Sequence, residues 1–327
     1  MFPISHRLLA LLVLNISAQI ISMNLPKQLT IKEITAVENP KRIGFINSHS
    51  LMIASETGAS IVNWPDNVTI KNIYKSDMFP LQCFLNNKKN AIAVSSPFRV
   101  NLYNLEGEKT WALNKQNASI VFTPSDTLYA LSGSTLECNT GKTFNVPGDA
   151  PFWYGVIAAH PTKEKIFYTN YEPTSNSVLF TVNLDQDPVV TTSQELPNPS
   201  NKSDNMTFAQ LHSPCENIIA LSYPTNETWT LYNPENHTLI LEDIRCRTLA
   251  FHPTKSLLAM LTKDGYIELY DFKTKKTISR TTESLGQVPA WESLNERLID
   301  FSEGGDFLAV IVDKKCFVVS NLYPKID

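Results

Sequence analysis

The sequence lacks the short motifs by which many catalytic and metal sites are recognised. It contains no G-x-S-x-G, no H-E-x-x-H and no glycine-rich phosphate loop. The five cysteines are odd in number and widely spaced, and they form neither a disulfide framework nor a C-x-x-C pair. We expect buried free thiols, with one disulfide as the alternative, for Cys83, Cys138, Cys215, Cys246 and Cys316. The sequence therefore predicts no catalytic residue, no cofactor and no metal.

The sequence also lacks a large excess of positive or negative charge. The 28 Lys and Arg residues and the 32 Asp and Glu residues give a net charge of -4, without a long run of either sign. This excludes the basic surface expected of a nucleic-acid-binding protein. Beyond residue 24, no segment approaches the roughly 20 apolar residues that a membrane-spanning helix needs. Helical periodicity is scarce, and residues 287–295 are the one candidate for a short helical turn.

The N-terminus differs from the rest of the chain. His6-Arg7 precedes the apolar run LLALLVL at residues 8–14, and small and polar residues follow it. This pattern resembles a secretory signal peptide, with cleavage after Ala18 or Ser22. We therefore predict a signal peptide at 1–22, a mature domain at 23–327, and a secreted or periplasmic (envelope) location. An uncleaved membrane anchor and an apolar arm packed on the domain are the alternatives.

Residues 247–280 have the clearest structural pattern. Short apolar segments at 248–251, 257–262 and 266–272 are separated by turn residues, and 277–280 follows as a fourth strand. Asp264-Gly265 is typical of a tight hairpin turn, because glycine adopts positive φ without steric cost. These residues predict one four-stranded antiparallel sheet.

Similar sets of strands recur along the chain with a period of roughly 40 residues, which is within the range of propeller repeats. Asn or Asp often follows the third strand, and His-Pro or Thr-Pro follows the first, where both favour turns. Because His160, His212 and His252 recur in such turns, we predict structural roles for them. The seven sets are 42–45, 51–55 and 60–64; 81–85, 91–95 and 99–105; 119–122, 127–131 and 135–138; 155–159, 165–169 and 177–184; 207–211, 217–222 and 228–232; 248–251, 257–262 and 266–272; 297–301, 307–312 and 316–320.

Three segments carry a family resemblance. FHPTKSLLAMLTKDGYIELYDFKTKKTI at 251–278 closely resembles a WD repeat, and IDFSEGGDFLAVIVDKKCFVVSNL at 299–322 and AAHPTKEKIFYTN at 158–170 resemble further repeats. The resemblance implies an all-β fold, a single seven-bladed β-propeller of four-stranded blades. Tyr270 stands where the family has Trp before Asp271, and the Gly-His pair that opens a typical repeat is missing. The family's hydrogen-bond tetrad is therefore absent, and we expect apolar packing to hold the blades together.

The last set ends after three strands, near the C-terminus. Residues 29–34 alternate like a lone strand and precede the first set. We predict that this N-terminal strand completes the seventh blade and closes the ring, which removes an exposed sheet edge.

Aromatic residues in the connections are the candidates for binding a partner. In such a propeller the second-to-third turns and the connections between blades share one face, which we call the loop face, and binding residues usually lie on such loops. Rings there offer large contact areas, although they could instead fill gaps between blades. The candidates are Phe152, Trp153, Tyr154, Trp291, Phe98, Tyr171 and Tyr223.

Two classes of function remain. The first is a non-catalytic binding or scaffold propeller, exported, that holds a protein or peptide on its loop face as a monomer or as a subunit of an envelope assembly. The alternative is an exported propeller hydrolase or lyase with a channel active site. Such a site would need convergent polar groups on the innermost strands, where the sequence is mostly apolar apart from Arg247, Arg297 and Asp300. Asn-x-Ser/Thr sequons also occur, and they matter only in a glycosylating secretory pathway; examples are Asn67, Asn117, Asn205, Asn226 and Asn236.

Overall fold

The computed structural model describes residues 29–75, 82–147, 157–170, 178–186, 189–196, 208–213, 216–223, 228–288 and 298–323. All regular structure in these ranges is β-strand, as expected for an all-β protein. They contain no helix long and apolar enough to cross a membrane. The predicted signal peptide, Cys215 and most of the expected helical turn lie outside these ranges.

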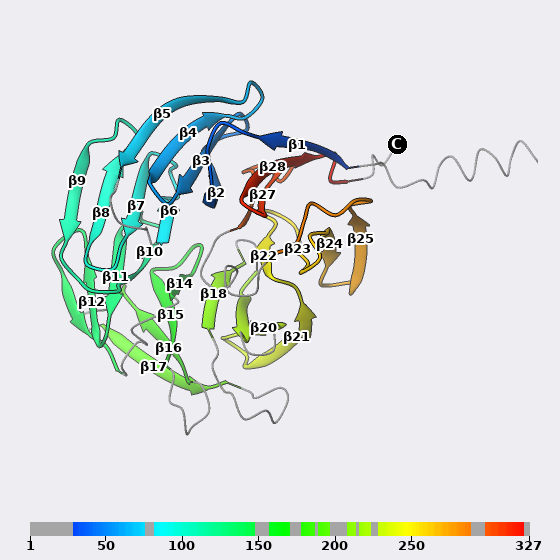
Figure 1. The fold of residues 1–327 in the computed structure, drawn as a ribbon. Helices are drawn as coiled ribbons and strands as arrows, with labels where there is room; N and C mark the ends of the chain where they lie inside the picture. The colour runs from blue at the N-terminus through cyan, green and yellow to red at the C-terminus, as the bar shows by residue number, and fades with distance from the viewer. Residues whose placement is uncertain are drawn as a thin grey trace, which may run out of the picture.

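Seven four-stranded antiparallel sheets form a ring (Figure 1). In six of them the strands pair in sequence order, so each sheet is a simple meander. We number these sheets as blades 1 to 6 in chain order, from β2–β5 to β22–β25, and blade 7 combines β26–β28 with β1. The seven-bladed propeller that the resemblance implies is thereby confirmed.

Each blade has one strand near the centre of the ring and one at the outer rim. The inner strands are β2 (Pro40–Phe45), β6 (Gln82–Leu85), β10 (Ser119–Phe122), β14 (Ile157–Ala159), β18 (Phe208–His212), β22 (Thr248–Phe251) and β26 (Ile299–Phe301). The second strands are β3 (Ser50–Ser55), β7 (Ala91–Ser95), β11 (Leu128–Ser132), β15 (Lys165–Asn170), β19 (Ile219–Tyr223), β23 (Leu257–Leu261) and β27 (Leu308–Val312). The third strands are β4 (Gly58–Asn63), β8 (Val100–Asn104), β12 (Thr135–Cys138), β16 (Val178–Asn183), β20 (Thr228–Asn233), β24 (Ile267–Asp271) and β28 (Lys315–Ser320). The outer strands are β5 (Val68–Lys75), β9 (Lys109–Leu113), β13 (Thr143–Asn145), β17 (Val190–Glu195), β21 (Thr238–Arg245), β25 (Lys276–Arg280) and β1 (Thr30–Ile34).

The N-terminal strand closes the ring as predicted. β1 pairs antiparallel with β28 over its whole length, from Thr30 opposite Ser320 to Ile34 opposite Cys316. Asn67 holds the segment that follows β1, because its Oδ1 accepts hydrogen bonds from the N–H groups of Thr35 and Ala36 at 2.9 and 3.1 Å. The first and last parts of the chain therefore share one sheet.

Apolar side chains fill the spaces between blades, as expected from the missing tetrad. The largest buried cluster runs through blades 6, 7 and 1, and it includes Leu261, Val310, Val318 and Ile53. Full burial of one such aliphatic side chain stabilises the fold by roughly 1.5–3 kcal/mol. Free thiols contribute to these layers: the four described cysteines, Cys83, Cys138, Cys246 and Cys316, are buried and unpaired, as predicted.

Two histidines hold the turns that follow inner strands. Nδ1 of His252 accepts hydrogen bonds from the N–H groups of Thr254 and Lys255 at 3.0 and 3.1 Å. Nδ1 of His160 makes the equivalent bonds in blade 4. The predicted structural role of these two residues is therefore confirmed. Corresponding positions in other blades hold Asn86, Thr123, Ser213 and Ser302, whose side-chain oxygens bond to the same kind of turn.

The predicted place of His212 in such a turn is wrong. His212 is the last residue of β18 and pairs with Ile219. Ser213 takes the turn position, and its Oγ accepts the N–H of Glu216. The sequence explains the shift, because Pro214 aligns with Pro253 and so places Ser213, not His212, opposite the histidine of blade 6.

Carboxylates link neighbouring blades where the family tetrad is absent. Oδ1 of Asp126 accepts the N–H of Asn87 from the preceding blade at 2.8 Å. Oε1 of Glu164 likewise accepts the N–H of Ser125 at 2.9 Å. These contacts lie at the end of the ring that carries the first-to-second and third-to-fourth turns, which we call the turn face. They join the blades in addition to the apolar layers.

Candidate functional site

The sequence predicts seven partner-binding aromatics on the loop face. The structure describes two of the seven candidates, Phe98 and Tyr223. The other five lie outside the described residues: Phe152, Trp153, Tyr154, Tyr171 and Trp291. The site is therefore built from the described part of this face.

Phe98 projects from the turn between β7 and β8. Its side chain is 56% exposed, and it is the one aromatic among the strongly exposed large apolar residues of the described ranges. The turn is short because the N–H of Ser96 donates to the carbonyl oxygen of Arg99 at 2.8 Å. Pro97 suits this position, because its ring presets φ and it has no N–H to satisfy.

The connection between blades 2 and 3 stabilises this turn by hydrogen bonds. The N–H of Asn117 donates to the carbonyl oxygen of Pro97 at 2.9 Å. The hydroxyl of Ser95 donates to the carbonyl oxygen of Ala118 at 2.5 Å. Because the backbone beneath Phe98 is fixed, a partner would lose little loop entropy when it covers the ring.

A ledge extends from Phe98 across blade 3. We call residues 96–99, 115–118 and 132–134 the Phe98 ledge. Ser132 donates from Oγ to the carbonyl oxygen of Gln116 at 2.8 Å, and Nζ of Lys115 lies 2.6 Å from Oε1 of Glu137. Arg99, the next residue of the turn, is also exposed. The ledge can therefore bury an apolar group and pair with a carboxylate next to it.

Tyr223 does not belong to this surface, which corrects its predicted location in a loop. It is the last residue of β19, and 6% of its surface is exposed. It packs in a cluster with Ala158, Phe167 and Leu196 between blades 4 and 5. The alternative interpretation, that aromatic rings fill gaps between blades, applies to this residue.

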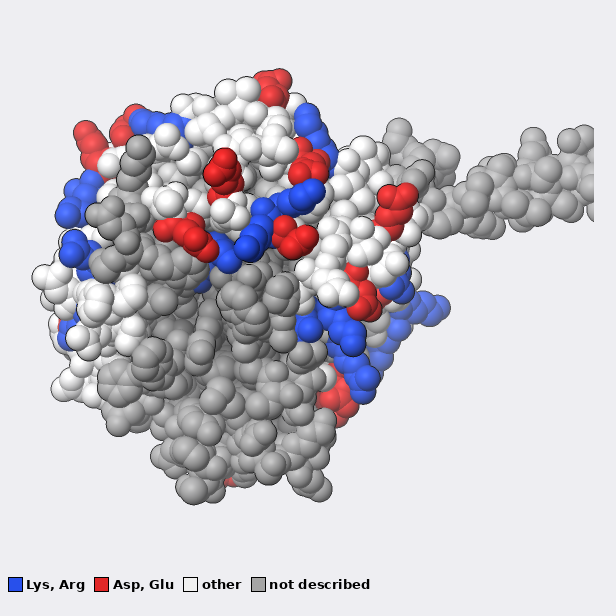
Figure 2. All heavy atoms as spheres, viewed as in Figure 1, with Lys and Arg blue, Asp and Glu red and all other residues white. Residues whose placement is uncertain are grey.

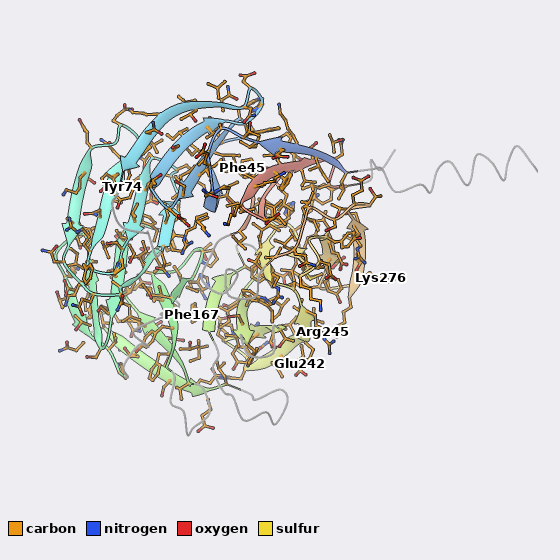
Figure 3. The ribbon with its side chains drawn as sticks, viewed as in Figure 1. Phe45, Tyr74, Phe167, Glu242, Arg245 and Lys276 are labelled. Carbon is orange, nitrogen blue, oxygen red and sulfur yellow. The ribbon has the colours of Figure 1, made fainter. Side chains whose placement is uncertain are left out.

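Two of the polar residues expected near the channel, Asp300 and Arg247, have structural partners. Asp300 of β26 is buried, and its Oδ2 accepts the N–H of Phe45 at 3.0 Å. Figure 3 places Phe45 close to the centre of the ring, while Tyr74 lies toward the outer rim. Nε of Arg247 donates to the carbonyl oxygen of Val288 at 3.1 Å, and Arg297 lies outside the described residues. The described ranges contain no group of three or more His, Cys, Asp or Glu side chains suited to a metal ion.

A polar cavity of about 140 Å³ opens near the turn face between blades 4 and 5. Lys165, Thr181 and Asn183 line it from blade 4, and Asn217 and Glu235 line it from blade 5. The hydrogen bond from the neighbouring Lys163 is the main reason that the pKa of Glu235 lies below its usual range. The sequence does not predict the cavity, because its walls come from residues about 70 positions apart, such as Lys165 and Glu235.

Charge on the visible face is mixed. Figure 2 shows Lys and Arg interspersed with Asp and Glu over the described surface, without a broad field of one sign. The labelled side chains of Figure 3 show the same at the outer rim, where Glu242 and Arg245 project from β21 and Lys276 projects from β25. Long-range steering of a strongly charged partner is therefore not a feature of this surface.

Comparison with known proteins supports the fold. A chain in the crystal structure of a mitotic checkpoint complex matches this structure with a TM-score of 0.67 and 10% sequence identity, over 92% of this chain and 96% of that chain. Many further solved chains match as well. No model of a known protein family matches the sequence, and no curated protein matches it. The comparisons thus show the seven-bladed propeller, while membership in the WD-repeat family stays a prediction.

Proposed function

We propose that this protein is an exported, non-catalytic propeller that holds a protein or peptide partner on its loop face, with Phe98 as a central contact. The observation that carries the proposal is the exposed phenyl ring on a turn whose backbone is fixed from behind. Buried aromatic anchors supply much of the energy of protein interfaces. A ring that is already positioned is suited to that role.

Three further observations support the proposal. The propeller is a rigid ring whose loops diverge in sequence, and loops on rigid scaffolds commonly bind partners. The matching solved chain comes from a complex of proteins. The apolar run near the N-terminus has the pattern of a secretion signal, which supports export.

The ledge also defines the chemistry of the partner. Phe98 favours an apolar group that fits over its ring, and Arg99 favours a carboxylate next to that group. A peptide segment with an aliphatic or aromatic residue beside Asp or Glu has both features. We therefore expect an acidic–apolar segment to lie on the ledge.

The binding proposal can be tested by crosslinking in the native compartment, followed by mass spectrometry of the captured partner. Phe98→Ala should lower recovery of the partner by about tenfold or more, as expected for a contact worth about 2 kcal/mol. Val190→Ala is the matched control, because Val190 is also an exposed apolar residue, at 41%, but lies on the outer rim. Equal recovery with Phe98→Ala and the wild type, both folded, would contradict the proposal.

Export is tested separately by fractionation and sequencing of the mature N-terminus. We expect the chain outside the cytoplasm, starting after Ala18 or Ser22. A cytoplasmic chain that keeps residues 1–22 would refute export, while leaving the binding proposal intact.

A further inference from the structure

Three sequon asparagines lie in described parts of the chain, and their surroundings differ. They are Asn67, Asn117 and Asn236. A sequon can be modified when its asparagine amide is accessible and the hydroxyl two residues later is close to it. The structure separates the three by these criteria.

Asn236 meets both criteria. It is exposed in the turn between β20 and β21, and its Oδ1 accepts a hydrogen bond from the hydroxyl of Thr238 at 2.6 Å. Its Nδ2 has no hydrogen-bond partner among the described residues. Asn233 fixes the turn, because its Oδ1 accepts the N–H groups of Glu235 and Asn236 at 2.9 and 3.2 Å.

The other two described sequons fail at least one criterion. Both ends of the Asn67 carboxamide are engaged, since Oδ1 accepts two backbone N–H groups and Nδ2 donates to Oγ1 of Thr35 at 2.7 Å. Asn117 is half-buried beneath the turn of Phe98, and its partner hydroxyl, on Ser119, is buried in β10. Asn236 is thus the described sequon that is presented for modification.

We propose that Asn236 is an N-glycosylation site. Its Nδ2 attacks the anomeric carbon of a lipid-diphosphate-linked oligosaccharide on a membrane oligosaccharyltransferase. The N–C bond forms as the bond from this carbon to the phosphate oxygen breaks; the lipid diphosphate leaves with the bonding pair, and the amide gives up one proton to a base. The Thr238 hydroxyl positions the carboxamide by its hydrogen bond to Oδ1. The inference rests on the proposed export.

The site lies on the turn face, because it belongs to a third-to-fourth turn. Phe98 lies in a second-to-third turn and therefore on the opposite face. A glycan on Asn236 would cover polar surface beside the cavity of blades 4 and 5, where Glu235 is its neighbour. It would leave the Phe98 ledge open to a partner.

The test uses the full chain expressed in a eukaryotic secretory host, in two forms. One keeps its own N-terminus, and the other has residues 1–22 replaced by a cleavable secretion signal of the host. Glycans are read from total cell extract plus medium, by sensitivity to peptide-N-glycosidase and by mass spectrometry of the Asn236 peptide. Asn236→Gln and Thr238→Ala should each remove one glycan, and Thr238→Ser, which keeps the hydroxyl, should retain it.

The outcomes separate the two proposals. A glycan on Asn236 in both forms supports the site and export together. A glycan in the form with the host signal but not in the form with the native N-terminus supports the site and refutes export. An unmodified Asn236 in the form with the host signal overturns the inference about the site, whatever the native N-terminus does.

Discussion

Two parts of the ring join their blades by different means. On the closing side, blades 6, 7 and 1 share one continuous apolar cluster, in which Leu308, Val310 and Val319 are fully buried. Between blades 4 and 5, the facing side chains near the turn face include Lys165, Thr181 and Asn183, and a cavity of about 140 Å³ separates the blades. The closing side is thus packed through one continuous apolar cluster, whereas blades 4 and 5 share an apolar cluster that gives way to a polar cavity near the turn face.

This difference indicates which boundaries between blades contribute most to the stability of the fold. Apolar surface removed from water stabilises the fold by roughly 25 cal/mol per Å², whereas polar side chains around an open cavity keep much of their contact with water. Local opening follows the regions with few buried apolar contacts. We therefore expect blades 4 and 5 to separate at the turn face more readily than blades 7 and 1. Four predictions test the comparison, from the largest expected effect to the smallest.

Removing apolar volume from the closing side should have the largest effect. Leu308→Ala should lower the free energy of unfolding by about 2–5 kcal/mol, because Leu308 is fully buried and the cavity would be filled only in part. Urea denaturation measures the change. Ile278→Ala is the control, since Ile278 is 38% exposed and should cost less than about 0.5 kcal/mol. Similar costs for both variants would show that the closing side is not specially stabilising.

The His252 turn should make the boundary of blades 6 and 7 sensitive to acid. Burial, followed by the charge of Lys255, lowers the pKa of His252 from 6.5 to about 4. The unfolded chain therefore binds more protons between these values, so stability is full above about pH 6.5 and falls as the pH approaches 4. The loss is on the order of 3 kcal/mol. Unfolding curves at pH 7, 5 and 4 measure it.

His252→Asn is the matched variant for this test, because Asn86 already fills the corresponding turn position in blade 2 with an amide oxygen. It should be less stable than the wild type at pH 7, since the imidazole also packs against Phe301 and Tyr323. Its stability should depend less on pH, by about the same 3 kcal/mol over this range. Identical pH profiles of the two proteins would disprove the assignment.

The link between Asp300 and blade 1 should have an intermediate effect. Asp300→Ala would leave the buried N–H of Phe45 without this acceptor, which should cost about 1–3 kcal/mol. Asp300→Asn keeps an acceptor oxygen and should cost less. Thermal and urea unfolding of the pair give the comparison, and an equal loss in both variants would show that the charge, not the hydrogen bond, is what matters.

Polar substitutions at the cavity of blades 4 and 5 should have the smallest effect. Thr181→Val exchanges a hydroxyl for a methyl group on a wall that faces an open cavity. We expect a change of less than about 0.5 kcal/mol, as for surface sites. A loss above 1 kcal/mol in urea unfolding would mean that this boundary is as tightly packed as the closing side.

The sequence was sufficient for the blades because they are local. Continuous apolar segments such as 91–95 and 119–122 match β7 and β10 residue for residue. Asp264-Gly265 also turns as expected: Gly265 has φ of 77°, and a Cβ there would clash with the carbonyl oxygen of Gly286. The apolar residues of a strand and the residues of its turn lie within a few positions of each other. They can therefore be identified from the sequence without knowledge of the fold.

Contacts between blades could not be found in the same way. Nothing near Asp126 in the sequence indicates that it bonds Asn87, and nothing near Tyr223 distinguishes a buried ring from an exposed one. Phe98 was predicted at the loop face and is exposed there. Its supporting bond from Asn117 could be seen only once the blades were placed. The polar cavity was missed because its lining residues belong to two blades.

The ring closed by β1 also determines when folding can finish. Nδ2 of Asn321 donates to Oγ1 of Thr30 at 3.0 Å, across 291 residues of sequence. During synthesis β1 therefore stays without its partner strand until β28 has been made, whereas blades 1 to 6 can form in chain order before then. Contacts between residues so far apart in sequence slow folding, because the entropy of closing a long loop is lost before the contact can stabilise the chain. Pairing of β1 with β28 is thus expected among the last steps in forming the ring, after the local pairing within blades 1 to 6.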